Sequence, residues 1–499
     1  MAVYLLAHDL GTSGNKASLF DENGALVKSM TCSYPLDVKN GNWAEQNADD
    51  WWKAVCDSTR ALLDGVNPAD IAGVSFSGQM MGALCVDRDG NPLRPSIIWA
   101  DMRAADLVDG LRKNIGAMEY YKLTGHRLSA SYSGAKLAWV RENEPDVYRK
   151  TDKVLNAKDY ILYKLTGNMV TEPSDGSSTC LLDISTLQWS ETLADLYGIS
   201  MDKLPELRRS VDLAGKVTKE AASLTGLLEG TPVICGGGDG PCAAVGSGAV
   251  KEGIANCCLG TSSWISFASK EPLIDENMTT FTFAHMVPGY VLPTGTMQQG
   301  GGALSWAVKT LFRDFPMDKS AIYDLVNREV SASPVGAKGL VFHPYLIGER
   351  SPRWNDKAKG SFIGLTLEHD RGDMLRAVME GVALNFTVIL DAFRENGAQI
   401  GAVNLLGGGA RNPAWRKILA DAMGVTIRTP TVLEEATSMG AAVTAGVGTG
   451  VFRDFSVIDK FLTIREEIQP DVTLHADYDE CRRRFDETYK VLEPLFNKY

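Results

Sequence analysis

The sequence Asp9-Leu10-Gly11-Thr12-Ser13-Gly14 stands directly after an apolar run, and its core returns as Leu259-Gly260-Thr261-Ser262. The two copies lie half of the 499-residue chain apart. Turns of Gly, Thr and Ser offer backbone N–H groups and hydroxyls to phosphate oxygens. The repeat therefore predicts two domains of one kind, whose turns hold a nucleotide's phosphates across a cleft. Two unrelated small-residue turns would also produce a match of four residues.

The composition is typical of a globular protein, with 44% apolar and 22% charged residues. A chain of this length is expected to form two or more domains. Its formal net charge of −12 argues against a surface that binds nucleic acid. Nine cysteines without a Cys-x-x-Cys pair predict reduced thiols in a cytoplasmic protein and no zinc site. No apolar stretch approaches the roughly 20 residues of a membrane span, so no membrane partner is expected.

Apolar runs separated by Gly and Asp turns predict an antiparallel meander that opens an α/β domain. The second half repeats this order, with strands expected at Ile254–Leu259 and Trp264–Ala268. Long helices are expected at Asp49–Leu63 and Asp373–Glu395, and residues from 100 to about 228 are expected to be mainly helical. The boundary is expected near residues 245 to 255, which divides the chain into domains 1–248 and 249–499.

Two aspartates stand beside predicted turns. Asp9 precedes the first phosphate turn, where a carboxylate can hold Mg²⁺ near the β- and γ-phosphates of ATP. An Asx turn, in which Asp9 caps its own backbone, explains the same residue equally well. Asp239 follows three glycines and precedes a predicted helix, whose dipole favours the ionised carboxylate. Such a group suits a base that accepts a substrate hydroxyl proton, and plain helix N-capping is the alternative.

Further glycine turns extend the predicted nucleotide site. Gly407-Gly408-Gly409 follows a strand and favours close approach to an adenosine, with Asn412 as a polar contact or a helix cap. A structural turn explains most such glycine runs. The predicted nucleotide contacts are Gly11, Thr12, Ser13, Lys16, Gly260, Thr261, Gly301, Gly408, Gly409 and Asn412.

The segment Gln79-Met80-Met81-Gly82 ends a predicted strand on the side of the phosphate turns. Methionines there line a pocket or simply belong to the core. Trp99 follows the next apolar run and is expected to shape the same pocket. The predicted substrate contacts are Gln79, Met80, Met81, Trp99, Asp239 and Gly240. A Walker-type NTPase is disfavoured because the sequence lacks the Gly-x-x-x-x-Gly-Lys-Ser/Thr motif.

At this point the chain resembles the FGGY carbohydrate kinases over nearly its whole length. The opening 9–14 looks like the first phosphate loop of that family, and Ser131–Asn143 fits its first signature. Tyr345–Pro352 is similar to another family segment. The second signature is matched, in order, by Gly360, Phe362, Gly364, Leu365, Asp373, Met374, Ala377, Val378, Met379 and Glu380.

The resemblance implies two actin-like domains of the ribonuclease-H type, with ATP and a sugar in the cleft between them. It implies that Asp239 is the catalytic base and that Asp9 lies by Mg-ATP. It also makes Gly260-Thr261 the second phosphate contact and Gly408 with Asn412 part of the adenosine site. A homodimer is an expectation of the family alone.

Within the family, the chain resembles the xylulokinase branch most, with two departures. Met81 stands where xylulokinases typically have His, and Gly240 where they typically have Asn. Losing an imidazole and an amide removes partners for sugar hydroxyls. D-xylulose remains the expected substrate, with another ketose, a polyol or a sugar acid as alternatives. An ATPase of the actin or Hsp70 kind and a non-catalytic sugar sensor are alternatives from other classes.

Overall fold

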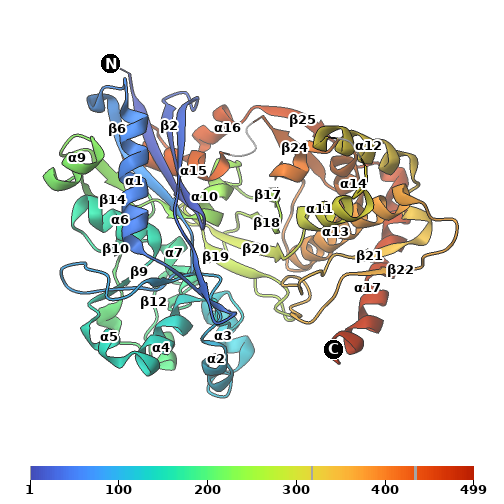
Figure 1. Cartoon of the computed structure of the whole chain (residues 1–499), viewed down its shortest axis with the longest axis horizontal. Coiled ribbons are helices and arrows are strands. Elements are labelled where there is room, and N and C mark those ends of the chain that lie inside the picture. The colour runs from blue at the N-terminus through green and yellow to red at the C-terminus, as the bar shows by residue number, and fades with distance from the viewer. Residues whose placement is uncertain (1, 316–317, 432–434, 499) are drawn as a thin grey trace.

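The computed structural model describes residues 2–315, 318–431 and 435–498, so the outer limits of the two expected domains, at 1 and 499, lie outside the described residues. Two separate seven-stranded sheets form the framework, one from each half of the sequence (Figure 1). Each sheet is built around the strand that precedes one copy of the repeated turn. The α/β class and the two-domain architecture predicted from the repeat are confirmed.

In the first sheet, β1 (Tyr4–Leu10) pairs antiparallel with β2 (Gly14–Asp21) and parallel with β6 (Ile71–Gly78). Because β1 lies between two strands, both of its edges are hydrogen-bonded and its end is held firmly. The remaining strands of this sheet are β3 (Leu26–Ser33), β14 (Leu213–Lys216), β15 (Pro232–Ile234) and β16 (Gly237–Gly238), which pairs with β6.

The second sheet repeats this arrangement. Its central strand β17 (Ile254–Leu259) pairs antiparallel with β18 (Ser263–Phe267) and parallel with β23 (Ala402–Leu406). The outer strands are β19 (Phe281–Ala284), β20 (Val291–Met297), β24 (Thr426–Pro430) and β25 (Ile464–Ile468). The sequence analysis assigned no strand to β19 or β20. Pro293 and Gly295 lie inside β20, and both residue types are depleted in strands.

Helices cover the sheets. The first half contains α1 (Ala48–Leu63), α2 (Ala105–Leu111), α3 (Ala117–Thr124), α4 (Ser133–Asn143), α5 (Pro145–Lys150), α6 (Ala157–Thr166), α7 (Pro173–Ser178), α8 (Glu191–Tyr197), α9 (Lys219–Thr225) and α10 (Asp239–Gly246). The second half contains α11 (Gly301–Leu311), α12 (Lys319–Ala332), α13 (Arg371–Glu395), α14 (Pro413–Met423), α15 (Ala436–Gly448), α16 (Ile458–Phe461) and α17 (His475–Phe496).

Short strand pairs complete the fold. They are β4 (Asp37–Lys39) with β5 (Trp43–Gln46) and β8 (Ser96–Ile97), β7 (Leu84–Val86) with β9 (Lys153–Leu155), β10 (Val170–Thr171) with β13 (Glu206–Leu207), β11 (Leu182–Asp183) with β12 (Gln188–Trp189), and β21 (Val341–His343) with β22 (Ser361–Ile363). Five of these strands, β9 to β13, interrupt the region that was expected to be mainly helical.

Helix α15 comes from the second half of the sequence but packs on the first sheet, beside α10 (Figure 1). Their apolar side chains share one core with Leu5 and Ala7 of β1. The two helices approach closely at glycines. A Cβ on Gly246 would lie 1.8 Å from the carbonyl oxygen of Ala436, and one on Gly440 would lie 2.0 Å from that of Cys242. The α10–α15 contact therefore joins the two halves of the chain.

We expect Gly246→Ala to lower the free energy of unfolding by about 1–3 kcal/mol, because the added methyl group forces the two helix backbones apart. Thermal unfolding of the variant measures this loss. Gly110→Ala is the matched control, since Gly110 lies in α2 with no atom within 4 Å of its would-be Cβ. Alanine should leave that helix unchanged or stabilise it. Equal melting temperatures for both variants would contradict the close packing.

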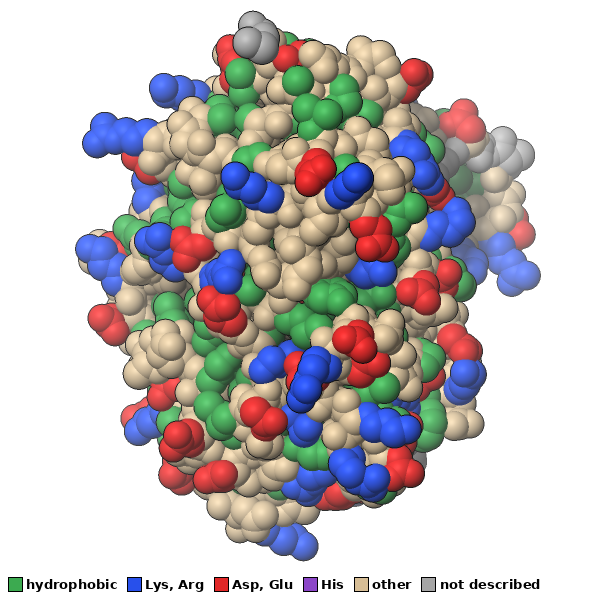
Figure 2. Space-filling model, turned by 90° about the vertical axis from the view of Figure 1, so that its left-hand side faces the viewer, with side chains coloured by type: hydrophobic (Ala, Val, Ile, Leu, Met, Phe, Trp, Pro, Cys, Tyr) green, Lys and Arg blue, Asp and Glu red, His purple; other side chains and the backbone are tan. Residues whose placement is uncertain are grey.

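Positive and negative side chains are interspersed over the face of the molecule drawn in Figure 2, without a continuous basic area. The described portion of the chain contains no helix that is both long and apolar enough to cross a membrane.

Candidate active site

A cavity of about 520 Å³ lies between the two halves of the chain. The first sheet and its connections contribute one wall, and the second sheet contributes the other. The structure brings seven of the predicted site residues to this cavity: Asp9, Gly11, Met80, Met81, Trp99, Asp239 and Gly240. The two aspartates that sequence analysis singled out therefore share one space, although they are far apart in the sequence.

Asp239 is the first residue of α10, directly after the short strand β16. One of its carboxylate oxygens accepts the Gly240 N–H at 2.7 Å. Burial raises the pKa of Asp239 to about 7, and the negative charge of Asp9 adds to the rise. Asp239 thus exchanges its proton near neutral pH, which is the range that suits a general base or acid.

Asp9 stands near the end of β1, where its neighbour in β6 is Ser77. The Ser77 hydroxyl donates a 2.8 Å hydrogen bond to the Asp9 carboxylate. Burial raises the pKa of Asp9, while hydrogen bonds from Ser77 and Thr437 and the charge of Lys16 oppose the rise. Asp9 is therefore held by side chains from both halves of the chain, since Thr437 belongs to α15.

The first Gly-Thr-Ser turn connects β1 to β2. The Gly11 N–H donates to the Gly14 carbonyl at 3.0 Å, and the Trp99 indole N–H donates to the Thr12 hydroxyl at 2.9 Å. Lys16, just after the turn, forms a 2.8 Å ion pair with Glu435. Of the nucleotide contacts predicted here, Gly11 lines the cavity, whereas Thr12, Ser13 and Lys16 do not.

The second turn is enclosed by two glycine segments. The Gly301 N–H donates to the Gly260 carbonyl at 2.7 Å, and those of Gly300 and Gly302 donate to the Thr261 carbonyl. On the other side, a Cβ on Gly409 would lie 2.4 Å from the Leu259 side chain. These glycines therefore allow α11 and the 407–409 turn to approach the strand end.

The adenosine positions predicted from the glycine run lie outside the cavity lining. Gly408 has no atom within 4 Å of its would-be Cβ, so its surroundings are open. The Asn412 side chain is buried and accepts the Trp415 N–H at 2.9 Å as the N-cap of α14. The cap, which was one of two interpretations of Asn412, is the role that this structure displays.

The predicted substrate residues divide into two groups. Met80 and Met81 line the cavity, and Met81 has a positive φ of 64°, a conformation that costs energy in a non-glycine residue. Gln79 does not line it; its side-chain amide donates to the Gln46 side chain at 2.7 Å, so it supports the wall from behind. Gly240 faces open space, with no atom within 4 Å of its would-be Cβ.

Several cavity residues escaped the sequence analysis. Phe281 and Phe283 belong to β19, to which the sequence analysis assigned no strand. Arg350 also lines the cavity, with its guanidinium 5.7 Å from the centre of the Phe281 ring. Arg350 lies in the Tyr345–Pro352 segment quoted for the family resemblance, so that segment was the signal for it. Gly407, which belongs to the glycine run quoted for the adenosine, also lines the cavity. The other residues missed are Ala243, Cys258, Trp264, Ser266, Leu292, Thr294, Thr296, Leu406, Ala436 and Thr437.

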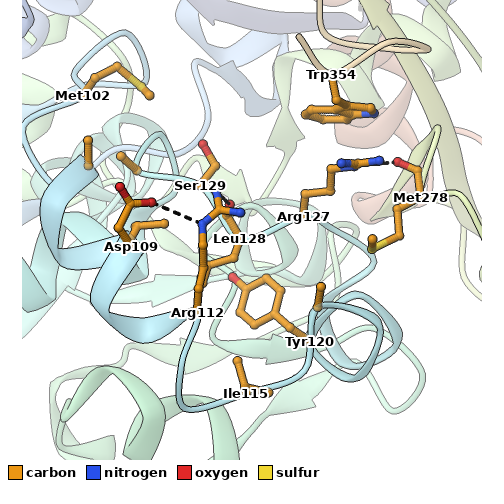
Figure 3. A pocket seen from close by; sticks show the side chains of 14 residues that line it. Met102, Asp109, Arg112, Ile115, Tyr120, Arg127, Leu128, Ser129, Met278 and Trp354 are labelled. Atoms are coloured by element: carbon orange, nitrogen blue, oxygen red, sulfur yellow. Dashed lines mark hydrogen bonds and ion pairs between the residues drawn. The ribbon is translucent and has the colours of Figure 1, made fainter. Parts of the chain in front are cut away.

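A second cavity of about 410 Å³ lies near the first and contains none of the predicted site residues (Figure 3). Figure 3 shows Arg127 beneath the Trp354 indole, and its guanidinium lies 5.1 Å from the ring centre. Arg127 donates hydrogen bonds to the carbonyls of Met278 and Asn277. Because these acceptors come from the second half of the chain, Arg127 serves as a link between the halves.

Comparison with known proteins places this site in a family. The N-terminal domain of the FGGY family of carbohydrate kinases matches residues 4–246, and the C-terminal domain matches residues 255–449. The xylulose kinase of Bacillus subtilis strain 168 is 34% identical over 451 residues, covering 90% of this chain and 89% of that protein. The gluconokinase of the same organism is 30% identical over 504 residues, covering 99% and 95%.

Solved structures agree with this assignment. The gluconate kinase from Lactobacillus acidophilus has a TM-score of 0.94 to this chain at 28% identity, with both chains covered completely. The resemblance inferred from the two signatures, the actin-like two-domain fold and the assignment as a xylulokinase-like sugar kinase are confirmed. The chain belongs to the FGGY family of carbohydrate kinases.

Proposed function

We propose that this kinase transfers the γ-phosphoryl group of ATP to a hydroxyl of a ketopentose, with D-xylulose as substrate and Asp239 as general base. The observation that carries the proposal is the shared cavity. Asp239 lines this cavity together with Met80 and Met81, which would face the sugar, and with Asp9 and Gly11 of the first phosphate turn. The matched xylulose kinase supports the choice of sugar.

In this mechanism the ionised Asp239 accepts the proton of the sugar hydroxyl. The hydroxyl oxygen then bonds to the γ-phosphorus as the bond to ADP breaks, so that the products are ADP and a sugar phosphate. The pKa of about 7 suits this task, because about half of the carboxylates are ionised at neutral pH and the group remains basic enough to hold a proton. The N–H groups of the two repeated turns would bind the phosphates from both sides.

Asp9 is the residue that would hold Mg²⁺. Magnesium in phosphoryl-transfer sites binds one or two carboxylates and completes its shell with substrate phosphates and water. The described residues contain no group of three His, Cys, Asp or Glu that could hold a metal by themselves. A single carboxylate beside a phosphate turn fits a metal that arrives with the nucleotide. When bound, Mg²⁺ would neutralise charge on the phosphate oxygens.

A sugar acid such as D-gluconate is the second candidate substrate, because Arg350 brings a guanidinium into the cavity. Guanidinium groups bind carboxylates through paired hydrogen bonds. A gluconokinase and a gluconate kinase are among the similar proteins. Arg350 would then recognise the carboxylate of the acid, and Asp239 would keep its role.

ADP release with Mg-ATP, measured against ketopentoses, ketohexoses, polyols and sugar acids, tests the substrate. We expect the highest kcat/KM with D-xylulose. A higher kcat/KM with D-gluconate would show that the substrate is the sugar acid and not the ketopentose. Equal ADP release with and without every sugar would overturn the kinase proposal in favour of an ATPase.

The double variant Met81→His/Gly240→Asn tests the two departures from the xylulokinase pattern. We expect kcat/KM for D-xylulose to rise by about 2–10-fold for each hydrogen bond restored. Gly240 has room for the side chain, and His tolerates the positive φ of residue 81 better than most residues. An unchanged kcat/KM would show that neither position contacts the sugar. Gly401→Asn, at another open glycine, controls for added bulk.

A further inference from the structure

The short helix α7 is polar in sequence and yet buried from its second residue onward. Its residues Ser174, Asp175, Ser177 and Ser178 all have exposed fractions of 0%. In Figure 1, α7 lies near the centre of the molecule beside β19 of the second sheet. Buried hydroxyl groups require hydrogen-bond partners, so the partners of these serines reveal what the helix holds.

Each of the three serines accepts a backbone N–H from a different segment of the cavity wall. Ser174 accepts the N–H of Gly238 at 3.0 Å, and Gly238 directly precedes Asp239. Ser178 accepts the N–H of Met81 at 3.1 Å.

Ser177 accepts the N–H of Ala284 at 3.0 Å, next to Phe283 of β19. One helix thus holds the segment of the proposed base, the methionine wall and the aromatic wall of the opposite half.

The serine hydroxyls have fixed directions because their own protons are also used. Ser177 donates to the Ser174 carbonyl and Ser178 to the Asp175 carbonyl, both at 2.8 Å. Ser174 donates to the Glu172 carboxylate at 2.7 Å. A hydroxyl has one proton to donate, and each serine has already donated it within α7 or to Glu172. The backbone N–H of the wall segment therefore meets a lone pair of the serine oxygen, and the donated hydrogen bond fixes the direction of that lone pair.

The helix is itself anchored by a buried ionic cluster. Glu172 caps α7 by accepting the N–H groups of Ser174 and Asp175. The ammonium group of Lys158 lies 3.1 Å from the Asp175 carboxylate and 3.6 Å from that of Glu172. All of these side chains are fully buried. A different arrangement of α7 would leave buried charges unpaired, which costs free energy, so the ionic cluster favours the observed one.

We propose that Ser174, Ser177 and Ser178 are positioning residues that set the three walls of the active cavity, an inference that rests on the proposed function of Asp239. Ser174 fixes the position of the proposed base, Asp239, and therefore affects the phosphoryl-transfer step. Ser178 sets the conformation of Met81, whose positive φ needs an external restraint, and acts on sugar binding. Ser177 fixes β19 against the first half and also acts on sugar binding.

The three alanine variants separate positioning from general stability. Misplacement of a reacting group by about 1 Å can cost 10²-fold in rate, so we expect Ser174→Ala to lower kcat by about 10–100-fold with little change in the KM of the sugar. Ser178→Ala and Ser177→Ala should raise the KM of the sugar by about 10-fold and leave kcat largely intact.

Steady-state kinetics with Mg-ATP and D-xylulose, or D-gluconate if it is the faster substrate, provide the measurement. Ser247→Ala is the matched control, because Ser247 is also fully buried and its hydroxyl donates to the Ala244 carbonyl of its own helix. If an alanine variant does not fold, the cysteine variant replaces it, since the somewhat larger thiol leaves no void and is a weaker acceptor than the hydroxyl.

Different kinetic signatures for Ser174 and Ser178 would support the proposal. The same change in kcat and KM for all three variants, or values equal to those of Ser247→Ala, would overturn it. The proposed function is tested separately with Asp239→Asn. Full activity of that variant refutes the base, whereas its inactivity together with unchanged serine variants refutes only the positioning role.

Discussion

Asp239→Ala is expected to lower kcat for sugar phosphorylation by about 10²–10⁴-fold, the usual contribution of a general base. The variant removes the carboxylate that lines the cavity at the start of α10. The affinity for ATP should change little, because the phosphate turns and the glycines around Gly260 remain in place. Coupled ADP release and ATP titration by calorimetry give the two quantities.

The matched control for this prediction is Asp454→Asn. Asp454 also stands at the start of a short helix, where it accepts the Ser456 N–H, but it lies on the surface. Its loss should leave kcat unchanged. If Asp239→Ala turned over nearly as fast as Asp454→Asn, Asp239 would not be the general base. The assignment of the chain to its family would still hold.

The pH dependence follows from the raised pKa of Asp239. A base acts only when it is ionised, so kcat/KM should fall about tenfold for each pH unit below a pKa of about 7. Above that pH, kcat/KM should no longer change with pH. A carboxylate in water, with its ordinary pKa near 4, would place the limb about three units lower. The position of the limb therefore reports whether the burial seen around Asp239 exists in solution.

The repeated turn could be predicted from the sequence because the turn, the strand before it and the aspartate beside it are local features. The hairpin at the centre of each sheet, β1 with β2 and β17 with β18, was therefore foreseeable from Leu10-Gly11-Thr12-Ser13 and its copy. Gly301 could also be predicted from its neighbours, since it stands at the beginning of a helix. Its hydrogen-bond partner, the Gly260 carbonyl, is known only from the folded structure.

The parts that escaped prediction depend on contacts between distant segments. Arg350 reaches the cavity only because the second half folds against the first. Strand β20 is held by pairing with β18 and β19 despite its proline and glycine. The role of α7 is hidden in the same way, because Ser174 and Gly238 are 64 positions apart. Local propensity carries no information about such partners.

Asp9→Asn is expected to lower kcat by about 10²–10³-fold, the typical cost of losing electrostatic support for a developing charge. The amide keeps the size of the side chain and can still bond to Ser77, so the end of β1 should keep its geometry. What disappears is the negative charge that would bind Mg²⁺. The Mg²⁺ concentration needed for half-maximal activity should therefore rise together with the loss of kcat.

The residual activity of Asp9→Asn carries a second and independent signal. The charge of Asp9 helps to raise the pKa of Asp239, so its removal should lower that pKa and move the acidic limb of kcat/KM to lower pH. Asp70→Asn, which removes a partly exposed carboxylate directly before β6, should shift neither the limb nor the Mg²⁺ requirement. A limb that stays at pH 7 in Asp9→Asn would show that the two carboxylates do not interact. An unchanged Mg²⁺ requirement would place the metal elsewhere. Both shifts together would establish Asp9 as the residue that serves the nucleotide's metal and also tunes the base.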